Sequence, residues 1–315
     1  MKFATGIQQL IGNTPLLELT HMDIPNGCRI FAKLEYLNPG GSVKDRLGVS
    51  LIEDAERRGV LKPGGTMIEP TAGNTGIGLA LAAIGKGYKV KFIVPEKFSQ
   101  EKQSLMRALG AEVINTPTEA GMKGAIAKAK ELAEQENAFS PSQFSNPANP
   151  DTYVRTLGPE LWEALDGKIN VFVAGAGSGG TFMGTSRYLK SKNKDIKTVI
   201  VEPEGSILNG GESGPHLTEG IGMEFLPGYM DESYFDSIHT VMDKEAFAAL
   251  KELAKKEGLL VGSSSGAAYV AALREAEKAE PGSHIVTVFA DSSERYMSQD
   301  IYGRTFEEDK NESKN

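Results

Sequence analysis

One structural unit occurs twice in this 315-residue chain and constrains its fold more than any other feature. A short apolar run leads into a glycine-rich turn, and apolar residues at helical spacing follow the turn. The first turn reads "EPTAGNTGIG" (69–78) and the second reads "GAGSGG" (175–180). Strands that alternate with helices in this way predict an α/β protein with a mainly parallel sheet. Turns at the carboxyl ends of such strands border one crevice, so we expect the two turns to share a site.

The same alternation extends along most of the chain. A Ser/Pro/Asn-rich stretch (140–151) is the best internal boundary. The glycine-rich segment 205–228 has no periodicity and is predicted to be a functional loop. The charged end, 307–315, is predicted to be a frayed tail. Strands are predicted over 29–37, 66–71, 89–95, 112–117, 169–177, 197–203 and 284–291, and helices over 44–59, 75–87, 100–111, 119–137, 152–165, 181–192, 243–257 and 265–279.

Lys44 lies at an unfavourable position for a cation. Ser42 has the character of a helix N-cap, and Asp45 stands where a capping-box acid belongs, so Lys44 is expected in the first helical turn. A positive charge there opposes the helix dipole at a cost of up to about 1 kcal/mol. Most such residues are solvated surface lysines. The alternative is that the field lowers the pKa of the amine, as a Schiff-base lysine requires.

The second turn favours binding of a phosphate group. "GAGSGG" fits the dinucleotide fingerprint, and Glu202 ends the next strand where a ribose-binding acid would lie, so an NAD-binding Rossmann dehydrogenase is one alternative. Ser178 and Thr181, however, add hydroxyl donors that suit a terminal phosphate monoester. The first turn carries Thr71, Asn74 and Thr75, which are suited to an anion such as a carboxylate.

Composition excludes several classes of function. The formal net charge of −8 and the absence of basic runs argue against a nucleic-acid partner. Cys28 is the single cysteine, which rules out an internal disulfide and a CxxC metal site, and the four histidines are too dispersed for a metal site. No stretch approaches 18 apolar residues and no secretory segment is evident, so we expect no membrane association and a cytoplasmic location.

Several motifs, in the order in which they occur, resemble the cysteine synthase and cystathionine β-synthase family of pyridoxal-phosphate enzymes. The resemblance spans nearly the whole chain. It rests on "IGNTPLLEL" (11–19), "NPGGSVKDR" (38–46), "EPTAGNTGIGLA" (69–80), "QFSNPANP" (143–150), "GAGSGGT" (175–181), "EGIG" (219–222), "GSSSGAA" (262–268) and "DSSERYMS" (291–298).

The resemblance implies the tryptophan synthase β-like fold (fold type II), with two three-layer α/β domains and the active site in the cleft between them. An N-terminal substrate domain would comprise residues 1–12 and 35–150. A C-terminal domain that binds the cofactor phosphate would comprise 13–34 and 151–303, followed by a flexible tail, 304–315. A homodimer is also implied.

The resemblance also implies roles for particular residues. Lys44 would bind pyridoxal 5'-phosphate covalently and, once freed, remove the substrate's Cα proton. Asn74 would contact the cofactor's ring hydroxyl and Ser264 its ring nitrogen. The residues expected to bind the phosphate are Gly177, Ser178, Gly179, Gly180 and Thr181, and those expected to bind the substrates are Thr71, Gly73, Asn74, Thr75, Gln143, Gly220, Met223 and Glu224.

The implied reaction is β-replacement on O-acetylserine or serine by a thiol, through an α-aminoacrylate intermediate. Ala72 stands where the family usually has serine, so one hydroxyl donor near the substrate is missing. Met223 and Glu224 follow "EGIG" as a bulky residue and an acid do in cystathionine-forming members. This favours homocysteine as the nucleophile, giving cystathionine. The alternatives are a cysteine synthase that uses sulfide and a catalytically silent binding module.

Overall fold

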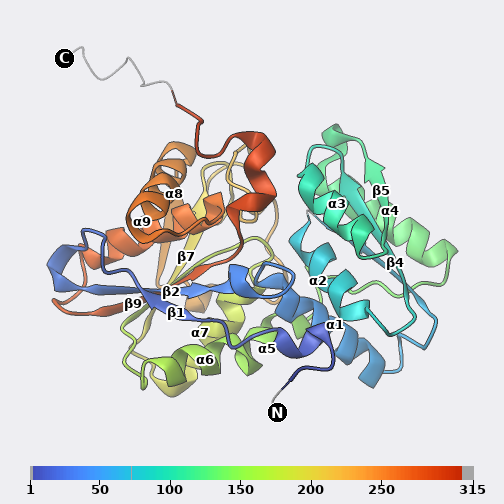
Figure 1. The fold of residues 1–315 in the computed structure, drawn as a ribbon, viewed down its shortest axis with the longest axis horizontal. Helices are drawn as coiled ribbons and strands as arrows, with labels where there is room; N and C mark the ends of the chain where they lie inside the picture. Colours follow the sequence, from blue (N-terminus) through green and yellow to red (C-terminus); the bar gives the residue numbers. More distant parts are fainter. Residues whose placement is uncertain (1–2, 72, 307–315) are drawn as a thin grey trace.

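The computed structural model describes residues 3–71 and 73–306, which form two sheets lying side by side (Figure 1). The larger sheet has the order β1 (Leu16–Glu18), β2 (Arg29–Leu34), β9 (His284–Phe289), β6 (Val171–Gly175), β7 (Lys197–Pro203) and β8 (Ser237–Val241). The smaller sheet has the order β3 (Thr66–Pro70), β4 (Lys89–Pro95) and β5 (Glu112–Thr116). Among the described strands, β1 pairs antiparallel with β2 and all other neighbours are parallel, which confirms the predicted α/β class.

Helices cover both faces of each sheet, giving three layers (Figure 1). Their bounds are α1 (Lys44–Arg57), α2 (Asn74–Ala83), α3 (Gln100–Ala108), α4 (Gly121–Gln135), α5 (Ala148–Arg155), α6 (Leu157–Ala164), α7 (Gly180–Lys192), α8 (Asp243–Glu257) and α9 (Ser263–Ala276). We call β3–β5 with α1–α4 the small unit, and β1, β2 and β6–β9 with α5–α9 the large unit. The exact bounds of the two domains stay a prediction, and we propose them because β1 and β2 pair within the larger sheet.

The helix predicted over 152–165 is in fact two helices, which is a correction to the sequence analysis. Between α5 and α6, Thr156 has φ −123° and ψ −76°, which is not helical. Pro159 explains the break, because proline has no N–H for the carbonyl of Arg155 and its ring would clash with that carbonyl. Strands β1 and β8 were not predicted. In addition, the last three residues of the predicted strand 29–37 form a 3-10 turn, η3 (Glu35–Leu37).

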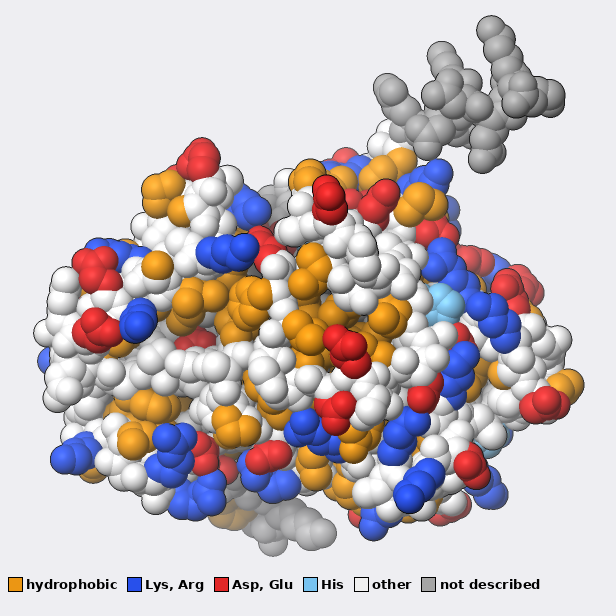
Figure 2. Space-filling view, turned by 180° about the vertical axis from the view of Figure 1, so that it is seen from behind, with side chains coloured by type: hydrophobic (Ala, Val, Ile, Leu, Met, Phe, Trp, Pro, Cys, Tyr) orange, Lys and Arg blue, Asp and Glu red, His pale blue; other side chains and the backbone are white. Residues whose placement is uncertain are grey.

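The surface carries apolar side chains as well as charge. Seen from behind, hydrophobic side chains gather in the middle of the molecule (Figure 2). Among the described residues, exposed large apolar side chains include Leu10, Leu37, Leu260 and Met297. No described helix combines the length and the hydropathy needed to cross a membrane. The predicted frayed tail, 307–315, lies outside the described residues.

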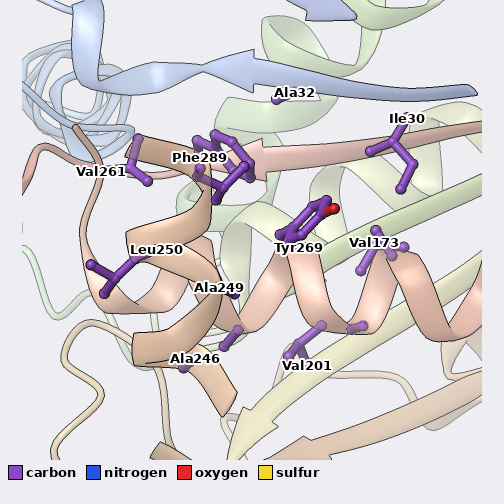
Figure 3. Close-up of a cluster of buried hydrophobic side chains, with 14 of the residues drawn as sticks. Ile30, Ala32, Val173, Val201, Ala246, Ala249, Leu250, Val261, Tyr269 and Phe289 are labelled. Atoms are coloured by element: carbon purple, nitrogen blue, oxygen red, sulfur yellow. The ribbon is translucent and has the colours of Figure 1, made fainter. Parts of the chain in front are cut away.

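The core of the large unit is packed on both faces of its sheet. On one face Tyr269 of α9 and Leu250 of α8 lie against strand residues that include Ile30, Val173 and Val201 (Figure 3). On the other face α5–α7 cover a second cluster around Phe172, Phe182 and Tyr153. These layers hold the carboxyl ends of β6 and β9, and the turns that follow them, in a fixed geometry.

Helices α1 and α2 of the small unit cross in very close contact because glycines face each other. A Cβ atom on Gly48 would lie 2.2 Å from the carbonyl of Gly78, and one on Gly78 would lie 2.3 Å from the carbonyl oxygen of Lys44. Neither position has room for a side chain. The crossing therefore fixes the start of α1, which carries Lys44, against the helix that follows the first glycine-rich turn.

Candidate active site

Lys44 is the first residue of α1, so its predicted place in the first helical turn is confirmed. The predicted cap is wrong in detail, because Val43 is the N-cap and adopts helical dihedral angles. Ser42 instead pairs with Asp291 in an isolated β-bridge, and its Oγ accepts a hydrogen bond from the Lys44 N–H at 3.2 Å. The Asp45 carboxylate accepts from the N–H of Gly40. These contacts anchor the turn that leads into α1.

The Lys44 amine is half-buried and makes no hydrogen bond or ion pair within the described residues. Burial lowers the pKa of this amine to about 8, although the negative charges of Asp291 and Glu35 oppose the shift. The lowered pKa agrees with the functional interpretation of the sequence. Its leading cause is burial, whereas the sequence analysis attributed it to the field of the helix.

The first glycine-rich turn brings together most of the residues predicted to bind the substrate carboxylate. The Thr71 Oγ1 accepts from the N–H groups of Gly73 (3.0 Å) and Gly76 (3.2 Å). Gly73 has φ +134°, a conformation that requires glycine. The Thr75 hydroxyl donates to Gln143 Oε1 at 2.7 Å, which places two distant segments side by side. Ala72, the departure from the family pattern, lies outside the described residues.

Glu69 holds the segment that carries Gln143. Its carboxylate is fully buried at the end of β3 and accepts the backbone N–H groups of Ser142 (2.8 Å) and Gln143 (2.9 Å). Burial raises the pKa of Glu69 to about 7, against the lowering effect of the two N–H donors. Sequence reasoning assigned this residue no role.

The second glycine-rich turn forms a cradle at the start of α7. A Cβ on Gly177 would lie 2.4 Å from the carbonyl oxygen of Gly220, and one on Gly180 would overlap the side chain of Asn149. Gly179 has φ +82° and caps α7. The Thr181 hydroxyl is buried and has no hydrogen-bond partner within the described part of the chain. An unpartnered donor at a helix N-terminus suits a bound phosphate.

Asn149 and Tyr229, which the sequence analysis missed, connect the segment that carries Gln143 to the second glycine-rich turn. The Asn149 Nδ2 lies 2.8 Å from the Gln143 carbonyl oxygen and 3.1 Å from Ser178 Oγ. The Tyr229 hydroxyl lies 2.8 Å from the carbonyl oxygens of both Gln143 and Ser178. The segment that carries Gln143 is thus in contact with the phosphate-type cradle.

The remaining predicted residues divide into two groups. Ser264 lies in the first turn of α9, and its Oγ would be 3.8 Å from a Cβ on Gly220, so both border the cradle. Met223 is buried in the core cluster of α5–α7, behind Gly179. Glu224 is exposed and lies next to Gly121 at the start of α4, so the structure does not bring it into contact with the other predicted residues.

Asn74 is fixed at both ends by residues that sequence reasoning did not assign. Its Nδ2 donates to Asp291 Oδ2 at 2.7 Å, and Arg295 Nη1 donates to its Oδ1 at 3.0 Å. The second oxygen of Asp291 is buried and has no partner within the described residues. The only available signal was the motif "DSSERYMS", whose position was noted without a role.

Comparison with known proteins identifies the family. A family model described as "Pyridoxal-phosphate dependent enzyme" matches residues 7–291, which is most of the chain. The chain belongs to this family of pyridoxal-phosphate dependent enzymes. A relative described as O-acetylserine dependent cystathionine beta-synthase, from Bacillus subtilis (strain 168), is 63% identical over 96% of this chain and 99% of its own. A cysteine synthase from Helicobacter pylori (strain ATCC 700392 / 26695) is 55% identical over 96% and 100%.

Solved structures confirm the predicted fold type. The crystal structure of an O-acetylserine dependent cystathionine beta-synthase from Helicobacter pylori superimposes with a TM-score of 0.93 at 55% identity, covering 96% of this chain and 100% of that chain. Both the sequence and the structure of the chain therefore place it among the pyridoxal-phosphate dependent enzymes. The predicted cofactor, enzyme class and tryptophan synthase β-like fold are confirmed.

The residues present fit the cofactor of the family. A free amine with a lowered pKa lies on α1, and a glycine cradle with an unpartnered hydroxyl begins α7. Glu202, in contrast, does not fit the dehydrogenase alternative. Its buried carboxylate accepts from the backbone N–H groups of Leu208 (2.8 Å) and Asn209 (3.1 Å), so it organises the loop after β7. Within the described residues, no group of three or more His, Cys, Asp and Glu could hold a metal ion.

Proposed function

We propose that the protein is an O-acetylserine-dependent cystathionine β-synthase, which replaces the acetate of O-acetylserine with the thiol of homocysteine. The C–O bond at Cβ breaks, a C–S bond forms, and cystathionine and acetate leave. The observation that carries this proposal is the 63% identity, over nearly the full length of both chains, to the Bacillus subtilis relative described by that name. Serine in place of O-acetylserine, and sulfide in place of homocysteine, are the alternatives to test.

Each group of side chains has a role in this proposal. Pyridoxal phosphate, when bound, supplies the electron sink for the reaction. Lys44 would hold the cofactor and, once its amine is freed, would remove the Cα proton, for which the lowered pKa of the free amine is suited. The groups Gly177–Thr181, Asn74 and Ser264 hold and orient the cofactor. Thr71, Gly73, Asn74, Thr75 and Gln143 bind the amino-acid carboxylate, because their polar groups converge at the first glycine-rich turn.

Glu224 and Met223 are proposed to favour homocysteine over sulfide. Glu224 is exposed beside the small unit, where a carboxylate can attract the amino group of an incoming amino-acid thiol. Phe225 contacts Phe144, with ring centroids 5.6 Å apart, so the segment after "EGIG" lies against the segment that carries Gln143. Met223 packs behind the cradle and sets the backbone position of Glu224.

Steady-state turnover with each first substrate and each thiol, in parallel, tests the proposal. We expect cystathionine from O-acetylserine and homocysteine as the fastest reaction, and no product from Lys44→Ala. Glu224→Gln should raise KM for homocysteine several-fold and leave the sulfide reaction unchanged, with Glu204→Gln as a matched control on another loop. Faster turnover with sulfide than with homocysteine would overturn the homocysteine assignment, and full activity of Lys44→Ala would overturn the site.

A homodimer and a cytoplasmic location complete the proposal. The apolar side chains in the middle of one face support a subunit interface (Figure 2). Sedimentation at micromolar concentration should give twice the mass of the 33.8 kDa chain. The single, buried cysteine, Cys28, is consistent with a reducing compartment.

A further inference from the structure

The N-terminus of α3 in the small unit docks on a 3-10 turn of the large unit, η6 (Ser293–Gln299). Ser99, the N-cap of α3, is buried and its Oγ lies 2.8 Å from the carbonyl oxygen of Arg295. Two residues along, the Glu101 carboxylate accepts the N–H of Ser298 at 3.1 Å. These contacts join segments about 200 residues apart in sequence.

Lys102 makes a third contact. Of the contacts made by Ser99, Glu101 and Lys102, it is the one that involves a buried charge. Its side chain is 3% exposed, and its Nζ lies 2.8 Å from the Tyr296 hydroxyl and 3.2 Å from Glu219 Oε2. Glu219 belongs to the "EGIG" segment and also accepts from Gln299 Nε2 at 2.5 Å. Removing one partner of a buried, hydrogen-bonded ion pair is strongly unfavourable, because the other charge remains buried.

The stem of Lys102 also supports the first glycine-rich turn. A Cβ on Gly73 would lie 2.3 Å from Lys102 Cδ and 3.0 Å from its Cβ, so the backbone of Gly73 rests directly on this side chain. The position of Lys102 therefore limits where Gly73, and with it Asn74, can lie.

Asn74 is also connected to the 3-10 turn η6, through Asp291 and Tyr296. The Tyr296 hydroxyl donates to Asp291 Oδ2, which also accepts from Asn74 Nδ2. One chain of contacts thus runs from Lys102 through Tyr296 and Asp291 to Asn74, and it passes from the small unit to the large unit and back.

We propose that Lys102, with Glu219 and Tyr296, forms a charged bridge between the two units that positions Gly73 and Asn74 to receive the amino-acid carboxylate. Lys102 is a positioning residue, since it acts through the turn that it supports. The proposal rests on the proposed function in one respect, which is that O-acetylserine is the amino acid used to measure it.

The test compares Lys102→Met, which keeps most of the stem and removes the charge, with Lys102→Arg, which keeps a cation. We expect Lys102→Met to raise KM for O-acetylserine about tenfold while kcat falls less than threefold, and Lys102→Arg to restore most of the loss. Hydrogen exchange of residues 70–80 should be faster in Lys102→Met, both with and without bound cofactor. Glu219→Gln, which leaves Lys102 in place, should change both measurements in the same direction.

Lys91→Met is the matched control, because it removes an ion pair with Glu136 that lies within the small unit. It should leave KM and exchange unchanged. If Lys102→Met has the KM and exchange of the unaltered protein, or if kcat alone falls, the bridge does not position the turn. A wild-type protein that makes no cystathionine would refute the proposed function instead, and the exchange data would still decide about the bridge.

Discussion

The pKa of Lys44 can be measured directly, in the protein from which pyridoxal phosphate has been removed. Burial lowers this pKa from 10.5 to about 8. At pH 7 an amine with a pKa of about 8 is neutral in roughly a tenth of the molecules, whereas one with a pKa of 10.5 is neutral in roughly 0.03%. Lys44 should therefore carry about 300 times more neutral amine than an exposed lysine at this pH.

Competitive acetylation with a trace of isotopically labelled acetic anhydride, followed by mass spectrometry, gives the pH profile of each lysine. We expect the profile of Lys44 to have its midpoint near pH 8. A lysine model peptide in the same mixture is the reference, with a pKa of about 10.4. A Lys44 midpoint above pH 10 would refute the account of burial as the dominant effect.

The variant Asp291→Asn separates the two opposing causes of the Lys44 shift. The negative charge of Asp291 raises the pKa of Lys44, against the effect of burial. Its removal should lower the acetylation midpoint further below 8. A rise in the midpoint would show that the Asp291 charge does not act on the amine in the way that the geometry indicates.

Two further variants test packing and burial near the site. Gly78→Ala puts a Cβ 2.3 Å from the Lys44 carbonyl oxygen, so urea unfolding should show a loss of about 1–3 kcal/mol from overpacking, partly offset by a gain of up to about 1 kcal/mol in helix propensity. Ser50→Ala on α1, expected to be near neutral, is its control. Glu69 has a pKa of about 7 in the folded protein, against an ordinary value of 4.5, so the folded protein binds this proton more tightly than the unfolded chain does. The free energy of unfolding should therefore fall as the pH rises from 5 to 7, by up to about 3 kcal/mol. Glu69→Gln should flatten this dependence, and an equally steep decline in the variant would contradict the raised pKa.

Local patterns predicted much of the fold and of the candidate site. Alternating apolar runs indicated the parallel strands, and the glycine-rich turns indicated two cradles, because strand, turn and helix are encoded in adjacent residues. The sequence pattern did not predict two strands, β1 and β8. β1 has only three residues, and β8 reads "SIHTV" at a sheet edge, where polar residues interrupt the apolar pattern.

The contacts missed at the site are those between distant segments. Lys102 and Glu219 are 117 residues apart, and Asn74 and Asp291 are 217 apart. No periodicity relates such pairs, so a lysine in "SQEKQS" reads as a solvated helical residue. Only the tertiary fold shows that it is buried.

The helix that carries Lys44 is itself held by a buried network of charges, which explains how one amine can be positioned at the boundary of two units. Arg46, one half-turn beyond Lys44, contacts Glu35 at 2.8 Å and Glu160 at 2.6 Å, and Lys33 also contacts Glu160 at 2.7 Å. Burial alone would raise the pKa of Glu160, but Arg46 and Lys33 outweigh it and lower this pKa to about 2.

Such a network adds little net stability, because the desolvation of its charges offsets much of their attraction. It is effective at specifying geometry, since any displacement of α1 would leave a buried charge unpaired. Lys33 comes from β2, Glu35 from η3 and Glu160 from α6, so this network fixes the start of α1 to the large unit. The Lys102 bridge connects α3 to the same unit. The two connections differ: in the first, Arg46 pairs with the two carboxylates of Glu35 and Glu160, whereas the second depends on the single ammonium group of Lys102. We therefore expect the Lys102 variants to leave α1 in place, because Arg46 holds α1 on the large unit through Glu35 and Glu160, neither of which contacts Lys102.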